Sequence, residues 1–391
     1  MADYTIKVRR YQPESGEPAY WEEFNVELDP SLSVLDGLLQ AKDRDDGSLA
    51  VRCSCRAAIC GSCGMKINGQ SGLGCQTQIG EAQEAADKKA AAVGGPAEGN
   101  VIVIEPMGNM PVIKDLVTDM ESTHWAKIRR VTPWLLPHGE APEREYIVEP
   151  ESMVDITQSM ACIQCGACVS SCLSMEADPL FIGPAALAKA YRFVGDPRDA
   201  ETSERLTDLA HDPHGIYDCT HCFSCVDACP KGVAPMDQIM RLRRKAGENG
   251  IEDPNSGHAH EMAFVKIIEK KGTLDEALLV QESYAPGILG KLLPSKRGIQ
   301  ETIRSLPTIM RPLLKRKVKL RQAIPGTHHK LPKDAMAEVQ AIYKHAEEHN
   351  EEFNLYIKGE EGDAEAAVEE RLEPDSADYL PTGGEKEASN G

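Results

Sequence analysis

Long apolar runs and aromatic residues are both scarce in this chain of 391 residues, of which only 5% are aromatic. No apolar run approaches the ~18 residues that a membrane span requires, so no transmembrane segment is expected. The pair Arg9-Arg10 near the start has no apolar stretch behind it, and it therefore does not indicate a secretory or twin-arginine signal. We expect a cytoplasmic protein.

Several motifs of enzymes are also missing. The sequence has no Walker loop, no Gly-x-Ser-x-Gly elbow, no dinucleotide-binding fingerprint and no His-Glu-x-x-His. The formal net charge of −19 argues against a nucleic-acid binder, because binding to phosphates requires a basic surface. Any bond-making chemistry is therefore expected on a partner.

Cysteine is abundant, yet all thirteen cysteines lie in three short groups. A disulfide framework is not expected, since the cytosol keeps thiols reduced. Buried structural cysteines would be scattered, so three tight groups indicate three local requirements for thiolate. The groups are Cys53, Cys55, Cys60, Cys63 and Cys75, then Cys162, Cys165, Cys168 and Cys172, then Cys219, Cys222, Cys225 and Cys229.

The fold class is predicted as α+β, with an N-terminal β-grasp domain over residues 1–110. Alternating and β-branched residues predict strands at 4–10, 20–28 and 101–106, and residues 33–42 read as a helix. The pair Asn68-Gly69 after a further strand is a strong hairpin signal. The Ala- and Gly-rich stretch between Cys75 and Val101 is expected to be an inserted helix or loop without chemistry of its own.

The remaining segments are predicted from composition. Residues 111–144 read as a linker, and 145–250 as a region of short helices that carries the other eight cysteines. Residues 251–345 form a basic, partly helical extension. Residues 346–391 belong to an acidic stretch, which holds seventeen acids against four bases from Asp334 onward and is expected to be disordered.

The first cysteine group matches the plant-type spacing for a 2Fe-2S cluster. Cys55, Cys60 and Cys63 lie in one loop with gaps of four and two residues, and Cys75 follows at a distance. Zinc is the main alternative, but its sites usually pair two short knuckles. Cys53 could replace Cys55 only by stretching the first gap to six, so it is interpreted as a packing thiol.

The second and third groups repeat one spacing, with gaps of two, two and three residues. In two-cluster ferredoxins the fourth cysteine of each run binds the other cluster. The predicted sites are therefore Cys162, Cys165, Cys168 and Cys229 for a 4Fe-4S cluster, and Cys172, Cys219, Cys222 and Cys225 for a third cluster. Three clusters in one chain would conduct single electrons.

Five ordered motifs carry a family resemblance. "SCRAAICGSC", "PVIKDLVTDM", "CIQCGACVSSC", "FIGPAALAKAYRF" and "CTHCFSCVDACPKGV" closely resemble the iron-sulfur subunit of succinate dehydrogenase and fumarate reductase, over residues 4–245. The resemblance implies a β-grasp 2Fe-2S domain followed by an all-α helical ferredoxin domain over residues 145–250. It also implies a flavoprotein partner that interconverts succinate and fumarate on FAD, and a membrane anchor that binds quinone. It implies a peripheral position on the cytoplasmic side of the cell membrane, with the 2Fe-2S domain toward the flavin.

One departure from the family pattern concerns the third cluster. Most relatives hold a 3Fe-4S cluster there and have an apolar residue in place of Cys222. Because Cys222 supplies the missing thiolate, we predict a 4Fe-4S cluster. If its side chain points away, the site stays 3Fe-4S.

A second departure concerns the quinone pocket. Leu173, Glu176, Ala177 and Thr220 occupy positions where ubiquinone-linked relatives have Pro, tryptophans and His. The family comparison thus favours a lower-potential acceptor such as menaquinone. His221 is interpreted as a surface histidine, with a hydrogen bond to quinone or to a cluster sulfur as the alternative.

The C-terminal extension is the third departure. Between Ser283 and Lys333 there are twelve Lys or Arg residues against one acid, Glu301. Such a basic amphipathic segment suits an anionic membrane surface, and a solvated arm along a partner subunit is the alternative.

Two other functions fit the clusters. The first is the iron-sulfur subunit of a thiol-linked fumarate reductase or a heterodisulfide-type reductase, although no cysteine follows Cys229 to form the cysteine-rich modules common there. The second is a ferredoxin-like electron shuttle, which explains neither the length nor the extension.

Overall fold

The structure, a computed structural model, describes residues 1–92, 99–137, 139, 144–148, 150–251, 257–284, 315 and 331–348. The chain divides into two compact units: residues 1–141 with 156–258, and residues 142–155 with 259–391. All the cysteines belong to the first unit. Most of the basic segment 283–333 and nearly all of the acidic tail lie outside the described residues.

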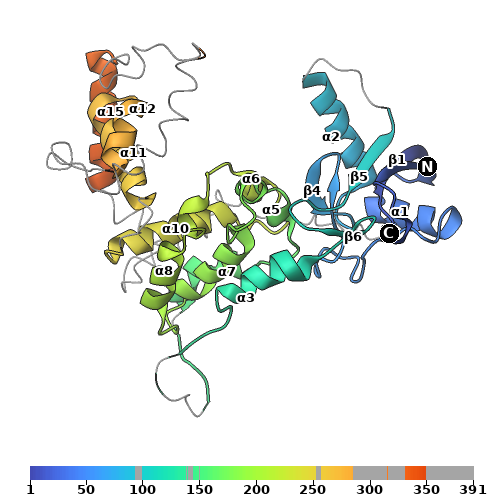
Figure 1. The fold of residues 1–391 in the computed structure, drawn as a ribbon, viewed down its shortest axis with the longest axis horizontal. Coiled ribbons are helices and arrows are strands. Elements are labelled where there is room, and N and C mark those ends of the chain that lie inside the picture. The colour runs from blue at the N-terminus through green and yellow to red at the C-terminus, as the bar shows by residue number, and fades with distance from the viewer. Residues whose placement is uncertain are drawn as a thin grey trace, which may run out of the picture. The chain divides into compact units, whose positions relative to one another are not determined.

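The first unit begins with a five-stranded mixed sheet (Figure 1). Its strands are β1 (Ala2–Arg10), β2 (Tyr20–Leu28), β3 (Gly64–Ile67), β4 (Gln70–Leu73) and β5 (Val101–Glu105), in the spatial order β2-β1-β5-β3-β4. Strand β5 pairs in parallel with β1 and antiparallel with β3. This order, with one helix packed across the sheet, is the predicted β-grasp.

Buried and more exposed residues alternate along β1, and this pattern determines which face of the sheet is buried. Tyr4, Ile6 and Val8 point into the core with Ile102 and Ile104 of β5, while the residues between them are more exposed. Helix α1 (Val34–Arg44) covers this core through Leu38. It begins at a capping box, in which Ser33 Oγ accepts from the Asp36 N–H and Asp36 Oδ2 accepts from the Ser33 N–H.

Arg10 ends the buried face of β1 and is fully buried. It donates from Nε to Asp115 Oδ1 at 3.0 Å and from Nη1 to Asp46 Oδ2 at 2.8 Å. Asp115 also accepts from the N–H groups of Tyr11 and Ala50. The buried charges are therefore paired and hydrogen-bonded, and they tie the sheet to the segment that follows it.

The stretch predicted as an inserted helix or loop is helix α2 (Ile79–Ala92). The segment 111–144, predicted as a linker, contains β6 (Val112–Lys114), β7 (Val117–Thr118), a π-helical turn η2 (Glu121–Trp125) and α3 (Ala126–Arg130). A short 3-10 helix, η1 (Pro13–Ser15), lies between β1 and β2.

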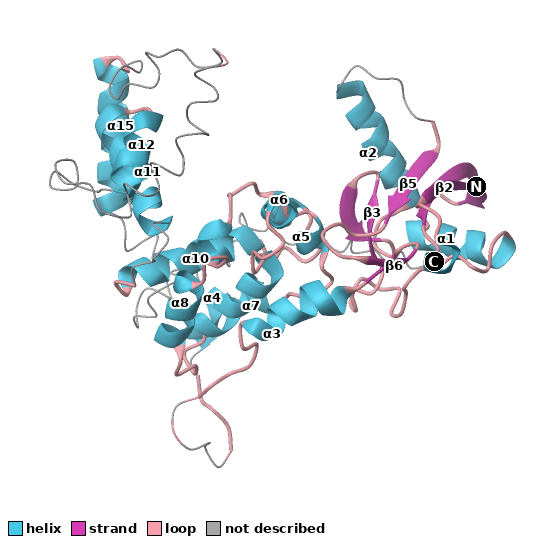
Figure 2. Ribbon diagram, in the orientation of Figure 1, coloured by secondary structure: helices cyan, strands magenta, loops and turns pink. Residues whose placement is uncertain are grey.

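The helical part of the first unit follows, as Figure 2 shows in cyan. Its elements are α4 (Val154–Met160), which begins at the boundary of the two units, α5 (Ala167–Ser170), α6 (Leu173–Ala177), α7 (Pro184–Val194), α8 (Thr202–His211), η4 (Ile216–Asp218), α9 (Ser224–Asp227) and α10 (Pro235–Glu248). The short 3-10 helix η3 (Pro150–Met153), just before α4, belongs to the second unit. Helices α7 and α10 form its core through Leu187, Tyr191, Ile239 and Leu242, all fully buried.

The second unit contains α11 (Gly257–Lys271), α12 (Glu276–Tyr284) and α15 (Lys333–Glu348). Its small core joins Ala263, Ile267 and Leu279. Within the described ranges, no helix combines the length and the apolar character needed to cross a membrane.

Candidate iron-sulfur sites

The loop of the first cysteine group presents its backbone N–H groups to sulfur. Cys55 Sγ accepts from the N–H groups of Ala57, Ile59 and Cys60 at 3.3–3.4 Å. Cys75 Sγ accepts from the Ala58 N–H at 3.3 Å, which joins the distant fourth cysteine to the loop. Such N–H donors stabilise thiolates bound to iron and tune the reduction potential.

Cys60 and Cys63 of this loop have different environments. Hydrogen bonds with the Ser62 side chain and with backbone N–H groups lower the pKa of the Cys60 thiol to about 6. Burial raises the pKa of the Cys63 thiol to about 12, although a hydrogen bond from the Cys75 N–H opposes that rise. Cys53 is half-buried and packs against the apolar cluster around Cys63.

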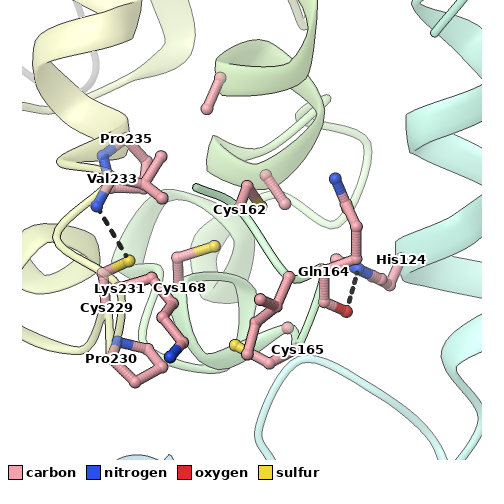
Figure 3. A pocket seen from close by; sticks show the side chains of 14 residues that line it. His124, Cys162, Gln164, Cys165, Cys168, Cys229, Pro230, Lys231, Val233 and Pro235 are labelled. Atoms are coloured by element: carbon pink, nitrogen blue, oxygen red, sulfur yellow. Dashed lines mark hydrogen bonds between the residues drawn. The ribbon is translucent and has the colours of Figure 1, made fainter. Parts of the chain in front are cut away.

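The second site is a pocket with mainly apolar walls, lined by cysteines of both later runs. Cys162, Cys165, Cys168 and Cys229 line it, so the fourth cysteine of the last run joins the first three of the middle run, as the spacing predicts. Figure 3 shows these side chains grouped around one space, with Cys229 and Cys165 on opposite sides. Cys229 Sγ accepts from the Val233 N–H at 3.3 Å.

Burial dominates the chemistry of this pocket. It raises the pKa of the Cys165 thiol to about 11, and it raises the pKa of the Cys168 thiol well above its usual range. Since iron binds thiolate, assembly of a cluster here must release protons from these thiols. The site has the four-thiol donor set that a cubane cluster requires.

His124 lines the same pocket and was missed by the sequence reasoning. It is 1% exposed, and burial lowers its pKa to about 4, so the ring is neutral at physiological pH. Its Nε2 lies 3.2 Å from the carbonyl oxygen of Gln164, which has a left-handed φ of +58° between two of the cysteines. A neutral ring that donates to this carbonyl holds the cysteine loop in its turn without adding charge.

The third site brings together the other four thiols. Burial raises the pKa of Cys172, and the charges of Cys219 and Cys222 raise it further. Burial also raises the pKa of Cys225 to about 12, with contributions from the same neighbours. Cys222 thus acts electrostatically on both Cys172 and Cys225.

Cys222 has the most polar surroundings of this group. Burial raises its pKa, but hydrogen bonds with Ser224, with the backbone of Leu173 and with the side chain of Thr220 outweigh that effect, and the pKa is lowered. Thr220 is itself hydrogen-bonded to Ser174, since its N–H donates to Ser174 Oγ at 3.3 Å. These polar groups favour the thiolate, which is the form that binds iron.

His221, for which the sequence favoured a surface position, is half-buried. Its Nε2 is hydrogen-bonded to Nη1 of Arg243, a buried residue of α10. The sequence analysis did not identify Arg243, because its hydrogen-bond partner His221 is distant in the sequence and is brought to it only by the fold.

Family matches agree with both parts of the first unit. A family model described as a 2Fe-2S iron-sulfur cluster binding domain matches residues 5–124, and one described as a 4Fe-4S dicluster domain matches residues 158–233. The predicted cofactor classes are thus confirmed. Which cysteine binds which iron stays a prediction.

Curated relatives match along nearly their whole length. The fumarate reductase iron-sulfur subunit of Mycobacterium tuberculosis (strain CDC 1551 / Oshkosh) is 38% identical over 254 residues, which are 64% of this chain and 96% of the relative. The chain belongs to the iron-sulfur subunits of succinate dehydrogenase and fumarate reductase. The succinate dehydrogenase iron-sulfur subunit of Coxiella burnetii is 35% identical, over 61% of this chain and 95% of the relative.

A solved structure shows that this iron-sulfur subunit shares a known fold. It is similar to a chain of the Mycobacterium smegmatis Sdh1 complex in the apo form, with a TM-score of 0.54 and 23% identity. The match covers 64% of this chain and 98% of the other. The resemblance and the α+β fold class read from the sequence are both confirmed.

Proposed function

We propose that this iron-sulfur subunit passes electrons one at a time between the FAD of a flavoprotein, which interconverts succinate and fumarate, and a quinone at a membrane anchor. When bound, the clusters supply one-electron chemistry, and the protein supplies thiolates, N–H donors and a dry environment. The single observation that carries the proposal is that this member of the family holds the twelve cysteines of the three predicted sites in one compact unit.

The ligand sets are part of this proposal. Cys55, Cys60, Cys63 and Cys75 would hold the 2Fe-2S cluster, Cys162, Cys165, Cys168 and Cys229 the 4Fe-4S cluster, and Cys172, Cys219, Cys222 and Cys225 the third cluster. The N–H donors around Cys55 and the pocket lined by both later runs support the first two sets. The electrostatic effect of Cys222 on Cys172 and Cys225 supports a 4Fe-4S cluster at the third.

The acceptor is proposed to be menaquinone, with the complex bound to the cytoplasmic side of the membrane. Thr220, where ubiquinone-linked relatives have His, supports a low-potential quinone. Leu173 and Phe223 are each more than half exposed beside the third site, as expected if another subunit covers them.

The test is purification of the native complex with its flavoprotein and anchor. We expect covalent or tightly bound flavin, succinate oxidation coupled to reduction of a menaquinone analogue, and EPR signals of reduced clusters after succinate is added. Purification of a lone chain without flavin, with clusters that succinate does not reduce, would refute the proposal and favour an electron shuttle.

A further inference from the structure

Gly61 lies between two predicted ligands of the first cluster and touches a predicted ligand of the second. It follows Cys60 and precedes Cys63 in the loop, with a left-handed φ of +73°. A Cβ atom built on Gly61 would lie 2.8 Å from Cβ and 2.9 Å from Cα of Cys165. Both atoms belong to the buried framework of the second site, so no flexible side-chain end could move aside.

A second glycine of the same loop, Gly64, also packs closely against Cys165. A Cβ on Gly64 would lie 3.2 Å from the carbonyl oxygen of Cys165 and 2.9 Å from the methyl group of Met107. The two glycines thus flank Cys63 on the side that faces Cys165. Side chains at these two positions would hold the cysteine loops apart.

The contact is also dry. Cys63 and Cys165 belong to one cluster of buried residues, and they are 3% and 8% exposed. The other members of this cluster are Leu35, Leu73 and Ala167. Apolar side chains therefore enclose the place where the two cysteine groups meet, and they exclude water from it.

Hydrogen bonds between serines hold the two cysteine-bearing parts at this separation. Ser71 of β4 lies 2.7 Å, oxygen to oxygen, from Ser170 of α5, and Ser171 Oγ donates to Ser71 Oγ at 2.9 Å. Ser170 Oγ also accepts from the Gly108 N–H at 2.8 Å. Both Ser71 and Ser170 are buried, which strengthens these bonds.

We infer that Gly61 is a positioning residue, which sets the separation of the first two clusters by allowing the loop of Cys60 and Cys63 to pack directly on Cys165. The inference rests on the proposed function, because it assigns that contact to the electron path. One electron crosses it at a time, so that the donor side is oxidised and the acceptor side reduced. No bond forms or breaks and no proton moves.

The test compares two variants in the purified complex. Gly61→Ala adds a Cβ against Cys165. Gly16→Ala is the matched control, because Gly16 has a similar φ of +69° and nothing lies within 4 Å of its added Cβ. Both variants place a Cβ on a residue with a left-handed φ, and only the first brings that Cβ against the second site.

The first readout is the magnetic interaction between the reduced first and second clusters, measured by EPR power saturation after iron content has been checked. The second is the rate at which the second cluster is reduced after flash or rapid-mix reduction of the first. We expect Gly61→Ala to weaken the interaction and to slow the transfer measurably, because the added Cβ moves the two sites apart. Gly16→Ala should match the wild type.

Equal interaction and equal rate in the two variants, at full cluster content, would overturn the inference. Should Gly61→Ala fail to take up the first cluster, the wild-type complex decides. Stronger coupling of the first cluster to the second than to the third supports the inference, and the reverse overturns it. A wild-type complex whose clusters succinate does not reduce refutes the proposed function instead, whereas the coupling between clusters can still be measured after chemical reduction.

Discussion

Arg243 on α10 donates from Nη2 to the backbone carbonyl oxygen of Cys219 at 3.0 Å. Its Nε donates to the carbonyl oxygen of Ile216 at 2.7 Å, and its guanidinium lies 5.2 Å from the ring centroid of Tyr217. The side chain is 4% exposed. One buried cation therefore fixes the backbone of the segment that leads into the third cysteine site.

Arg243→Met should weaken the third site before the others. It removes donors to buried carbonyl groups, and each acceptor left unsatisfied costs about 1–3 kcal/mol. We expect the third cluster to be lost selectively, seen as a lower iron content with the 2Fe-2S EPR signal retained. Arg244→Met, at an exposed position of the same helix, is the control. Equal loss of the third cluster in both variants would show that Arg243 has no specific role in holding the third site.

Cys222→Ala should convert the third site from a 4Fe-4S to a 3Fe-4S cluster. Three thiolates, those of Cys172, Cys219 and Cys225, would remain, and one iron would lack a protein ligand. The expected result is a loss of one iron per chain and a new EPR signal in the oxidised protein, because an oxidised 3Fe-4S cluster is paramagnetic. A wild-type protein that already shows this signal in full would contradict the assignment of Cys222.

Cys53→Ser and Cys55→Ser should have opposite outcomes at the first site. Cys55 Sγ accepts three backbone N–H groups of the loop, whereas Cys53 packs against apolar residues. We expect the 2Fe-2S EPR signal to persist in Cys53→Ser and to change or vanish in Cys55→Ser. If only Cys53→Ser loses the signal, Cys53 is the ligand of the cluster and Cys55 is the packing thiol.

The stability of the helical part should depend on pH through Asp196. Burial raises the pKa of this carboxyl, but hydrogen bonds from Arg198 and Arg192 outweigh it and the pKa falls to about 2. A folded-state pKa below the unfolded value stabilises the fold at higher pH, and this contribution is lost as pH falls from about 4 to about 2.

Asp196→Asn should therefore lower the free energy of unfolding by about 2 kcal/mol at pH 5, and the difference from the wild type should close toward pH 2. Thermal unfolding followed by far-UV circular dichroism at several pH values measures this. Asp43→Asn, at an exposed position of α1, should stay close to the wild type throughout. A difference that stays constant with pH would contradict the role of the Asp196 charge.

Local patterns were enough to predict the elements and the cysteine groups. The period of two along residues 4–10 places alternate side chains on one face of a strand, and Asn68-Gly69 closes the hairpin of β3 and β4. Gaps of two to four residues between cysteines bring thiols of one loop together, because the loop can turn within that length. Such signals depend on neighbours in the chain, and the sequence therefore contains them directly.

Only the tertiary structure decided how distant segments meet. The sequence had no signal for the hydrogen bond from Arg243 to the carbonyl oxygen of Cys219, or for the packing of Gly61 on Cys165. In each case the partner comes from another part of the chain, and its approach depends on buried apolar packing that many sequences could provide. The sequence by itself determined which side chains could bind iron, and the fold decided how close the cysteine groups lie to one another.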